Sequence, residues 1–187
     1  MDLLLRHLSE ITSVPENLKQ ELLNRVQINT FKKNEVIQQA NKVCKRTFFV
    51  KNGLLRIYFY KDGKIITDGF AAENEWMTSS YSFMRRVPDQ YIIAAIEPTE
   101  TYSLSLEDLI YLFENFHEME RYGRIIMSMQ FIQQSERLNS IRFTSPKEKY
   151  EHFSNTYKPI LNRIPLGMVA SYLGITQETL SRVRAVR

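Results

Sequence analysis

Hydrophobic residues recur with two different periods along the chain, and the changes of period mark its organisation. Helical spacing over residues 2–12 and from Ser13 to about Arg25 predicts two short helices, the second opened by a capping-box pattern, Ser13-Val-Pro-Glu16. The pattern then changes to short β-type runs, which are Val26–Phe31, Glu35–Gln38, Thr47–Lys51, Leu54–Tyr60, Ile65–Phe70, Tyr91–Ile96 and Thr101–Leu104. Helical spacing returns after Ser105. Strands followed by helices predict an α+β protein.

The β-rich part has the pattern of one closed fold. Asn52-Gly53 and Asp62-Gly63 separate consecutive runs with dipeptides that favour tight hairpin turns. Many short strands at this spacing are typical of a barrel or jelly roll. We therefore expect a β-roll of the double-stranded β-helix kind, flanked by helices.

Two helical segments follow the β-rich part. Ser105, with Asp108 three residues on, predicts a capped helix over residues 106–116. A second helix is expected over residues 117–139. Its apolar residues recur at spacings of three and four, which predicts a coiled-coil seam between two copies of the chain, formed by Met119, Tyr122, Ile126 and Met129. Packing of the same face on the β-roll remains the alternative, because a seam of this length is short.

The segment from Ile164 to Arg187 has the pattern of a helix-turn-helix. Apolar residues mark the inward faces of two short helices, namely Val169, Ala170 and Leu173 on the first and Leu180 and Val183 on the second. Between them, Gly174 permits the left-handed backbone of a sharp turn, and Thr176 is placed to cap the second helix. Another capping-box pattern, Ser145-Pro-Lys-Glu148, opens a helix before this motif.

The outward face of the second helix suits base recognition. A recognition helix reads bases mainly with residues near its N-terminus, and here these are Thr176, Gln177, Glu178, Ser181 and Arg182. Arg pairs with guanine, Gln with adenine, and Glu accepts from the amino group of cytosine. Glu178 and Arg182 lie four residues apart and could instead form only a surface ion pair. Within the complete turn pattern, DNA reading is the favoured interpretation.

Charge is distributed unevenly along the chain. The formal net charge is +4, from 25 Lys and Arg against 21 Asp and Glu. From Ile141 onward, eight basic residues accompany three acidic ones, so this part carries +5 and the first 140 residues carry −1. A basic segment joined to a near-neutral one indicates that only the C-terminal part binds a polyanion.

Other chemistry is sparse. The single cysteine, Cys44, excludes an internal disulfide and a four-cysteine iron–sulfur cluster, and it fits a cytoplasmic protein. His7, His117 and His152 lie in three different elements outside the β-rich part, so we expect no enzyme, no metal and no cofactor. The first residues do not resemble a signal peptide and no apolar run approaches membrane-spanning length, so no membrane partner is expected.

The segment Gly174-Ile-Thr-Gln-Glu-Thr-Leu-Ser-Arg-Val183 resembles the recognition helix of the Crp/Fnr transcription regulators. The order of a β-roll, a long helix and a helix-turn-helix is similar to that family over nearly the whole chain. The resemblance implies a sensor domain over residues 1–116, a dimerisation helix over 117–139 and a DNA-binding domain over 140–187. It further implies a homodimer that reads a pseudo-palindrome in double-stranded DNA, with RNA polymerase as a candidate partner.

Two details of this resemblance concern the recognition helix and the segment that follows it. Glu178 and Arg182 would read a half-site that contains C·G and G·C pairs, with Gln177 at the most variable position. The chain ends at Arg187 without the β-hairpin wing of many family members, so phosphate contacts from a wing are not expected.

The β-roll of this family is a cyclic-nucleotide-binding fold, and residues 48–58 resemble one of its hairpins. Members that bind cyclic AMP carry a Gly-Glu pair followed by Arg-Ser/Thr-Ala, and this chain lacks that cassette. One alignment puts Asp89 at the Arg position, where it would repel a phosphate. An alignment with an inserted loop instead pairs Glu75 with Arg85 or Arg86.

The effector is therefore expected to be an unknown small molecule, if there is one, rather than cyclic AMP. The aromatic residues Trp76, Tyr81 and Phe83 mark an alternative, apolar effector pocket. Two functions remain open: a dimeric DNA-binding transcription regulator, and a ligand-binding sensor or scaffold whose C-terminal helices bind a protein partner.

Overall fold

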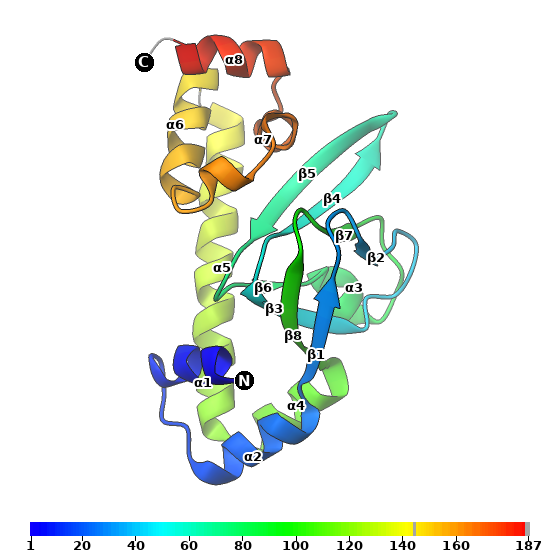
Figure 1. Ribbon diagram of the computed structural model, residues 1–187, viewed down its shortest axis with the longest axis vertical. Helices are drawn as coiled ribbons and strands as arrows, with labels where there is room; N and C mark the ends of the chain where they lie inside the picture. The colour runs from blue at the N-terminus through cyan, green and yellow to red at the C-terminus, as the bar shows by residue number, and fades with distance from the viewer. Residues whose placement is uncertain (144, 186–187) are drawn as a thin grey trace. The chain divides into compact units, whose positions relative to one another are not determined.

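The computed structural model describes residues 1–143 and 145–185 (Figure 1). Along the chain the elements are α1 (Asp2–Ser9), α2 (Glu16–Arg25), β1 (Gln27–Phe31), β2 (Val36–Gln38), β3 (Arg46–Asn52), β4 (Leu55–Lys61), β5 (Lys64–Ala71), β6 (Trp76–Met77), α3 (Ser80–Arg85), β7 (Ile92–Ala95), β8 (Thr99–Ser105), α4 (Leu106–Asn115), α5 (His117–Phe143), α6 (Pro146–Thr156), the 3-10 helix η1 (Leu161–Arg163), α7 (Leu166–Leu173) and α8 (Gln177–Ala185). The α+β class and the β-roll expected from the sequence are confirmed.

Two compact units make up the chain. The first contains Met1–Ile57 and Phe70–Ser128, and the second contains Tyr58–Gly69 together with the chain from Met129 on. This division differs from the expected one, in which residues 1–116 formed one domain and 117–139 a separate helix. The outer half of the β4–β5 hairpin belongs to the second unit because its hydrogen bonds run to the C-terminal helices, as described below.

The β-roll consists of two four-stranded sheets with strand orders β1-β8-β3-β6 and β2-β7-β4-β5. Side chains alternate along each strand, and β3 shows how this alternation builds two cores. Phe48 and Val50 point to one side, where they form a buried cluster with Leu55, Ala71, Met77, Ile93 and Ala95. Phe49 points to the other side and lies opposite Tyr102 of β8 in the antiparallel register.

Helices cover this second side of β3 and β8. Phe49 and Tyr102 pack with leucines of α1, α2 and α4 and with the beginning of α5, in a buried cluster that comprises Leu4, Leu8, Leu18, Leu22, Leu104, Leu112, Met119 and Tyr122. The two N-terminal helices are therefore part of the hydrophobic core of the first unit.

A polar network lies inside this apolar cluster. The indole Nε1 of Trp76 donates to the Tyr122 hydroxyl at 2.8 Å, and His7 Nδ1 lies 2.8 Å from the same oxygen. Burial raises the pKa of the Tyr122 phenol and lowers the pKa of His7. The Tyr122 hydroxyl then donates a hydrogen bond to Nδ1 of a neutral His7, so each member of the network has a partner.

Three local features differ from the sequence-based expectation. Ser13 does not cap α2, whose N-cap is Pro15 without a side-chain hydrogen bond. Neither β6 nor α3 was predicted, because a two-residue strand and a six-residue helix are too short to show a hydrophobic period. The Ser105 cap is confirmed, since its hydroxyl accepts from the amide of Asp108 at 3.1 Å.

The second unit is a small helical module with an aromatic core. Ser145 forms the expected capping box, accepting from the Glu148 amide at 3.3 Å while its own amide donates to the Glu148 carboxylate at 2.6 Å. Phe153, Tyr157 and Tyr172 pack with ring centroids 4.8 to 5.6 Å apart, and Leu180 of α8 is 1% exposed. Three helices thus share one core.

Arg137 of α5 joins this module to the β4–β5 hairpin. It is 8% exposed, and its guanidinium lies 3.6 Å from the centroid of the Tyr172 ring. Nη1 donates to the Tyr172 carbonyl at 3.3 Å and Nη2 to the Thr67 carbonyl at 3.1 Å, with an Asp68 carboxylate oxygen 3.9 Å away. The buried charge is therefore compensated by carbonyls, a carboxylate and an aromatic face.

Ser171 of α7 makes a second connection to the hairpin. Its hydroxyl donates to the Ile65 carbonyl at 2.6 Å and accepts from the Thr67 amide at 2.9 Å. Residues 65–67 of β5 are thus held against α7 by backbone groups. No helix among the described residues combines the length and the apolarity needed to cross a bilayer.

Candidate nucleic-acid interface

Helices α7 and α8 form the predicted helix-turn-helix. Gly174 ends α7 in the left-handed conformation, with φ 66° and ψ 33°, and the Ile175 amide donates to the Ala170 carbonyl at 3.1 Å. Such a helix end favours glycine because a side chain would be strained there. The Thr176 hydroxyl accepts from the Thr179 amide at 3.1 Å and so caps α8. The chain after Ala185, on which the expected lack of a wing depends, lies outside the described residues.

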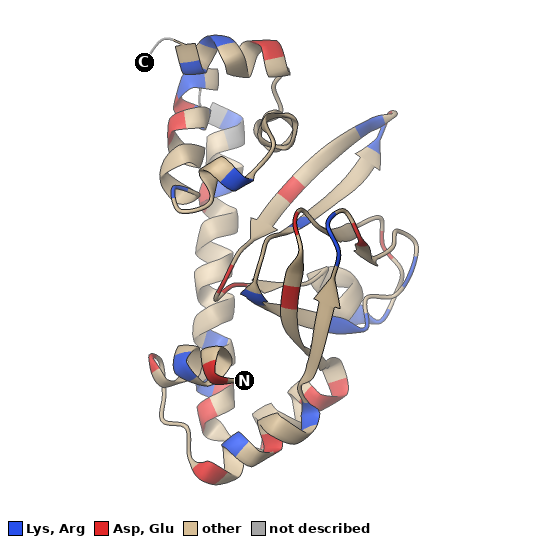
Figure 2. Cartoon of the chain, in the orientation of Figure 1, with Lys and Arg blue, Asp and Glu red and all other residues tan. Residues whose placement is uncertain are grey.

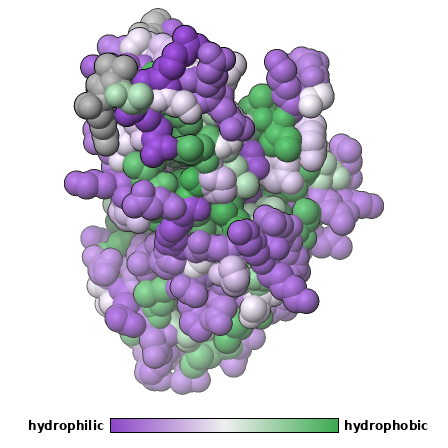
Figure 3. Space-filling model, turned by 45° about the horizontal axis from the view of Figure 1, so that its top comes forward, coloured by the Kyte–Doolittle hydropathy of each residue, from purple (hydrophilic) through white to green (hydrophobic). Residues whose placement is uncertain are grey.

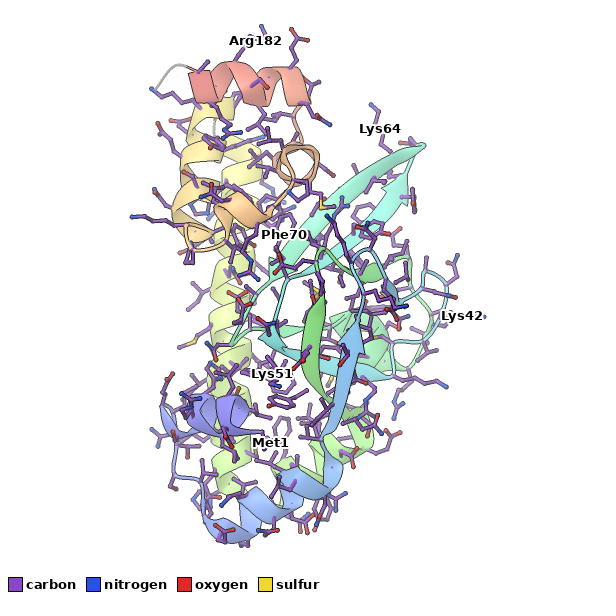
Figure 4. All side chains as sticks on the ribbon, in the orientation of Figure 1. Met1, Lys42, Lys51, Lys64, Phe70 and Arg182 are labelled. Carbon is purple, nitrogen blue, oxygen red and sulfur yellow. The ribbon has the colours of Figure 1, made fainter. Side chains whose placement is uncertain are left out.

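All five predicted reading residues are exposed, whereas Leu180 of α8 is buried. They are Thr176, Gln177, Glu178, Ser181 and Arg182. Figure 4 shows Arg182 pointing away from α8. The surface around α8, in the upper part of Figure 3, is mainly hydrophilic. An exposed row of donors and acceptors on a capped helix can meet base edges in a major groove.

Glu178 and Arg182 also form the ion pair that was the alternative interpretation. The carboxylate and guanidinium lie 3.4 Å apart, and the two side chains are 81% and 71% exposed. Such a pair stabilises a helix by only about 0.3–0.5 kcal/mol. Breaking this ion pair therefore costs little, and both side chains remain available for hydrogen bonds to bases.

Gln177 has a contact that the sequence did not indicate. A Cβ atom added to Gly167 of α7 would lie 2.9 Å from Gln177 Nε2, so the amide rests directly on the backbone of α7. The glycine at this position leaves room for the side chain that begins α8. Nothing in the spacing of the motif signals this contact.

The predicted dimer seam needs correction. Met119 and Tyr122 are 2% and 3% exposed within the core of the first unit, and Ile126 packs against the same core. They cannot face a second chain, so their spacing reflects packing inside the chain. Met129 is exposed, and a different set of apolar side chains on α5 is exposed with it: Met127, Phe131, Ile132 and Leu138.

The structure does not assemble the proposed cyclic-nucleotide pair. The Glu75 carboxylate accepts from the Ala72 amide at 2.8 Å. Arg86 pairs with Glu107 of α4, and Arg85 is exposed at the end of α3. The Asp89 carboxylate accepts from the Ser79 hydroxyl and, at 3.0 Å, from the Tyr91 amide. These carboxylates serve the local loops, and Arg86 has a carboxylate partner of its own.

The aromatic residues proposed as an apolar pocket are also separate. Trp76 donates to Tyr122, Phe83 is buried with Cys44 and Leu106, and Tyr81 is 62% exposed. They do not line one cavity. The sequence did not single out Arg46 of β3. Its guanidinium donates to the hydroxyl of Ser103 at 2.8 Å and to the Ser103 carbonyl at 2.9 Å.

Comparisons with known proteins agree with this architecture. Residues 28–116 match the family model of the cyclic nucleotide-binding domain. The structure of FixK2 from Bradyrhizobium japonicum is 16% identical and superimposes with a TM-score of 0.74, covering 86% of this chain and 83% of that one. A mutant of CooA from Carboxydothermus hydrogenoformans is 14% identical with a TM-score of 0.73, covering 94% and 84%.

A third structure carries the family name. A protein from Eubacterium rectale assigned to the Crp/Fnr family of transcriptional regulators is 21% identical with a TM-score of 0.70, covering 90% of this chain and 81% of that one. No curated protein matches the chain in sequence. Residues 28–116 therefore match a domain of the cyclic nucleotide-binding type, and the chain shares the fold of these three structures.

Proposed function

We propose that this protein is a dimeric, sequence-specific DNA-binding transcription regulator of the Crp/Fnr type. The observation that carries the proposal is the helix-turn-helix itself. Gly174 makes the turn, Thr176 caps α8, and the polar side chains of α8 are exposed. The FixK2 and CooA folds, together with the assignment of the Eubacterium rectale protein, support the regulatory role by likeness of architecture.

The charge distribution suits a polyanionic partner. Basic residues occur in α6, in α8 and at the tip of the β4–β5 hairpin, all within the second unit (Figure 2). Phosphate contacts supply the sequence-independent part of DNA affinity, and base contacts supply the preference.

Arg182→Ala is expected to weaken binding to the preferred duplex by about 1–3 kcal/mol and to relax the preference at one base pair in each half-site. The loss arises because no other side chain replaces a bidentate contact to guanine. Selection from a random duplex pool, followed by titration of the selected and random duplexes, measures both effects. Lys158→Ala is the control and should weaken both duplexes about equally. Equal losses for Arg182→Ala would remove it from base reading.

Recognition of a pseudo-palindromic site requires a dimer with two-fold symmetry. Two recognition helices must enter major grooves about 34 Å apart, which a dimer arranges. We place the seam on Met127, Phe131 and Leu138 of α5, which are exposed and recur at spacings of four and seven.

Cyclic AMP and cyclic GMP are not the proposed effectors. A buried phosphate needs a cation or several aimed amide donors, and Arg86 is paired with Glu107. Millimolar cyclic nucleotide should leave the melting temperature unchanged. A ligand at a hundred times its Kd would stabilise the fold by about 2.7 kcal/mol, which is a shift of several degrees. A rise of that size, abolished by Arg85→Ala or Arg86→Ala, would contradict this expectation.

The second candidate, a sensor whose C-terminal helices bind a protein, makes a different prediction for salt. Duplex binding should weaken steeply with salt, with a log–log slope near about −0.9 per neutralised phosphate. An apolar protein interface would depend little on salt. The absence of binding to any duplex at low salt would favour the second candidate.

A further inference from the structure

The outer half of the β4–β5 hairpin is built into the second unit. Residues 58–69 cluster with the C-terminal helices, although the rest of both strands belongs to the first unit. Ser171 of α7 bonds to Ile65 and Thr67, and Arg137 bonds to the Thr67 carbonyl. These contacts fix the hairpin against the first helix of the helix-turn-helix.

The tip itself makes a tight, exposed turn. Asp62 and Gly63 have φ angles of 50° and 72°, which define a two-residue turn of the type that matches strand twist. Lys61 and Lys64 flank this turn, so they lie opposite each other and their side chains share one face of the hairpin. Both are exposed, and neither forms an ion pair within the described residues.

The geometry points to a wing: we propose that the β4–β5 hairpin contacts DNA through Lys61 and Lys64, which bind backbone phosphates beside the groove that α8 enters. This inference rests on the proposed DNA-binding function and extends it to a segment of the β-roll. The hairpin lies beside α7, the first helix of the helix-turn-helix.

The position of the hairpin tip supports contact with phosphates rather than with base edges. The first helix of a helix-turn-helix crosses the DNA backbone, and the Ile65 carbonyl lies 2.6 Å from Ser171 Oγ on that helix. Lys64 is one residue further along the strand, or about 3.4 Å. In Figure 4 its side chain points upward from the tip, as Arg182 does from α8. A side chain beside the crossing helix meets phosphates first.

The chemistry of the tip agrees with this role. Lysine ammonium groups and tyrosine hydroxyls are common phosphate ligands, and Tyr60, 58% exposed, precedes Lys61. Asp62 is the single acid at the turn, so the tip keeps a net positive charge. Within the part of the chain that the structure describes, neither lysine has an ion pair to break on binding.

The double variant Lys61→Gln/Lys64→Gln tests the wing with a random-sequence duplex of about 30 base pairs, roughly three helical turns. Removal of two phosphate contacts should make the log–log salt slope shallower by about 1.8. Raising salt from about 50 to 200 mM should then weaken the variant about tenfold less than the wild type. The base preference of a selected site should not change.

Lys42→Gln/Lys45→Gln removes the same charge from the first unit and is the matched control. Its slope should stay close to that of the wild type. Ser171→Ala, which removes the hydrogen bonds that hold residues 65–67, should reproduce part of the wing effect with both lysines present.

The outcomes separate the wing from the underlying function. If the wild type binds no duplex, the DNA-binding function fails and the wing fails with it. If the wild type binds and the two double variants have equal slopes, only the wing is overturned. An unchanged slope with lost transcription output would assign the tip to a protein partner and would also overturn the wing.

Discussion

Arg137→Ala is expected to destabilise the second unit by about 3–5 kcal/mol, enough to unfold it at moderate temperature. The change removes the Arg137 hydrogen bonds to the Thr67 and Tyr172 carbonyls and the guanidinium over the Tyr172 ring. It also leaves a void in a site where the side chain is 8% exposed. Thermal and urea unfolding followed by circular dichroism measure the loss.

The control for this change is on the same helix. Arg124 is 63% exposed in an i,i+4 pair with Glu120, so Arg124→Ala should cost less than about 0.5 kcal/mol. Arg137→Lys keeps a charge but lacks the planar fork, and it should recover only part of the stability. A loss for Arg137→Ala no larger than that for Arg124→Ala would mean that the buried guanidinium is not what joins the hairpin to α7.

Phe131→Glu is expected to abolish the dimer. Phe131 is 74% exposed in one chain, so the substitution should not disturb the folded monomer. In the proposed seam it would bury a charge from each copy, and we expect the dimer Kd to rise at least about a hundredfold, or roughly 2.8 kcal/mol. Sedimentation at a concentration where the wild type is dimeric gives the readout, and affinity for the pseudo-palindrome should fall with it.

Two further substitutions locate the seam. Gln133→Glu adds the same charge to an exposed position on a different face of α5 and should leave the dimer intact. Ile126→Glu should lower the stability of the first unit, because Ile126 packs against its core. A dimeric Phe131→Glu protein would show that the seam lies elsewhere.

Most features set by local chemistry were predictable from the sequence, with the Ser13 cap as an exception, whereas features that depend on distant partners were not. Gly174, Thr176 and Ser145 act through neighbouring backbone groups, so their roles follow from spacing. Met119 and Tyr122 have the spacing of a dimer helix, but a three-four period is the same whether a helix packs on its own chain or on a copy.

Arg137 shows the second kind of limit. Its burial depends on Thr67, which lies 70 residues away in the sequence. A basic residue on a polar helix is normally exposed, and nothing near it in the sequence signals a buried partner. The hairpin divided between two units escaped prediction for the same reason, because hairpin chemistry reveals the turn but not what the strands contact.

The hydrogen bond from Trp76 to Tyr122 has a practical consequence for optical measurements. Trp76 is the single tryptophan of the chain and belongs to the first unit, so the second unit has tyrosines but no tryptophan. Emission excited at the red edge of the indole band therefore reports on the first unit alone. The emission maximum of Trp76 should shift when the first unit unfolds, because water then replaces Tyr122 as the partner of the indole. The maximum should stay constant while the second unit unfolds. Trp76 fluorescence can thus follow the unfolding of the first unit separately, without any label.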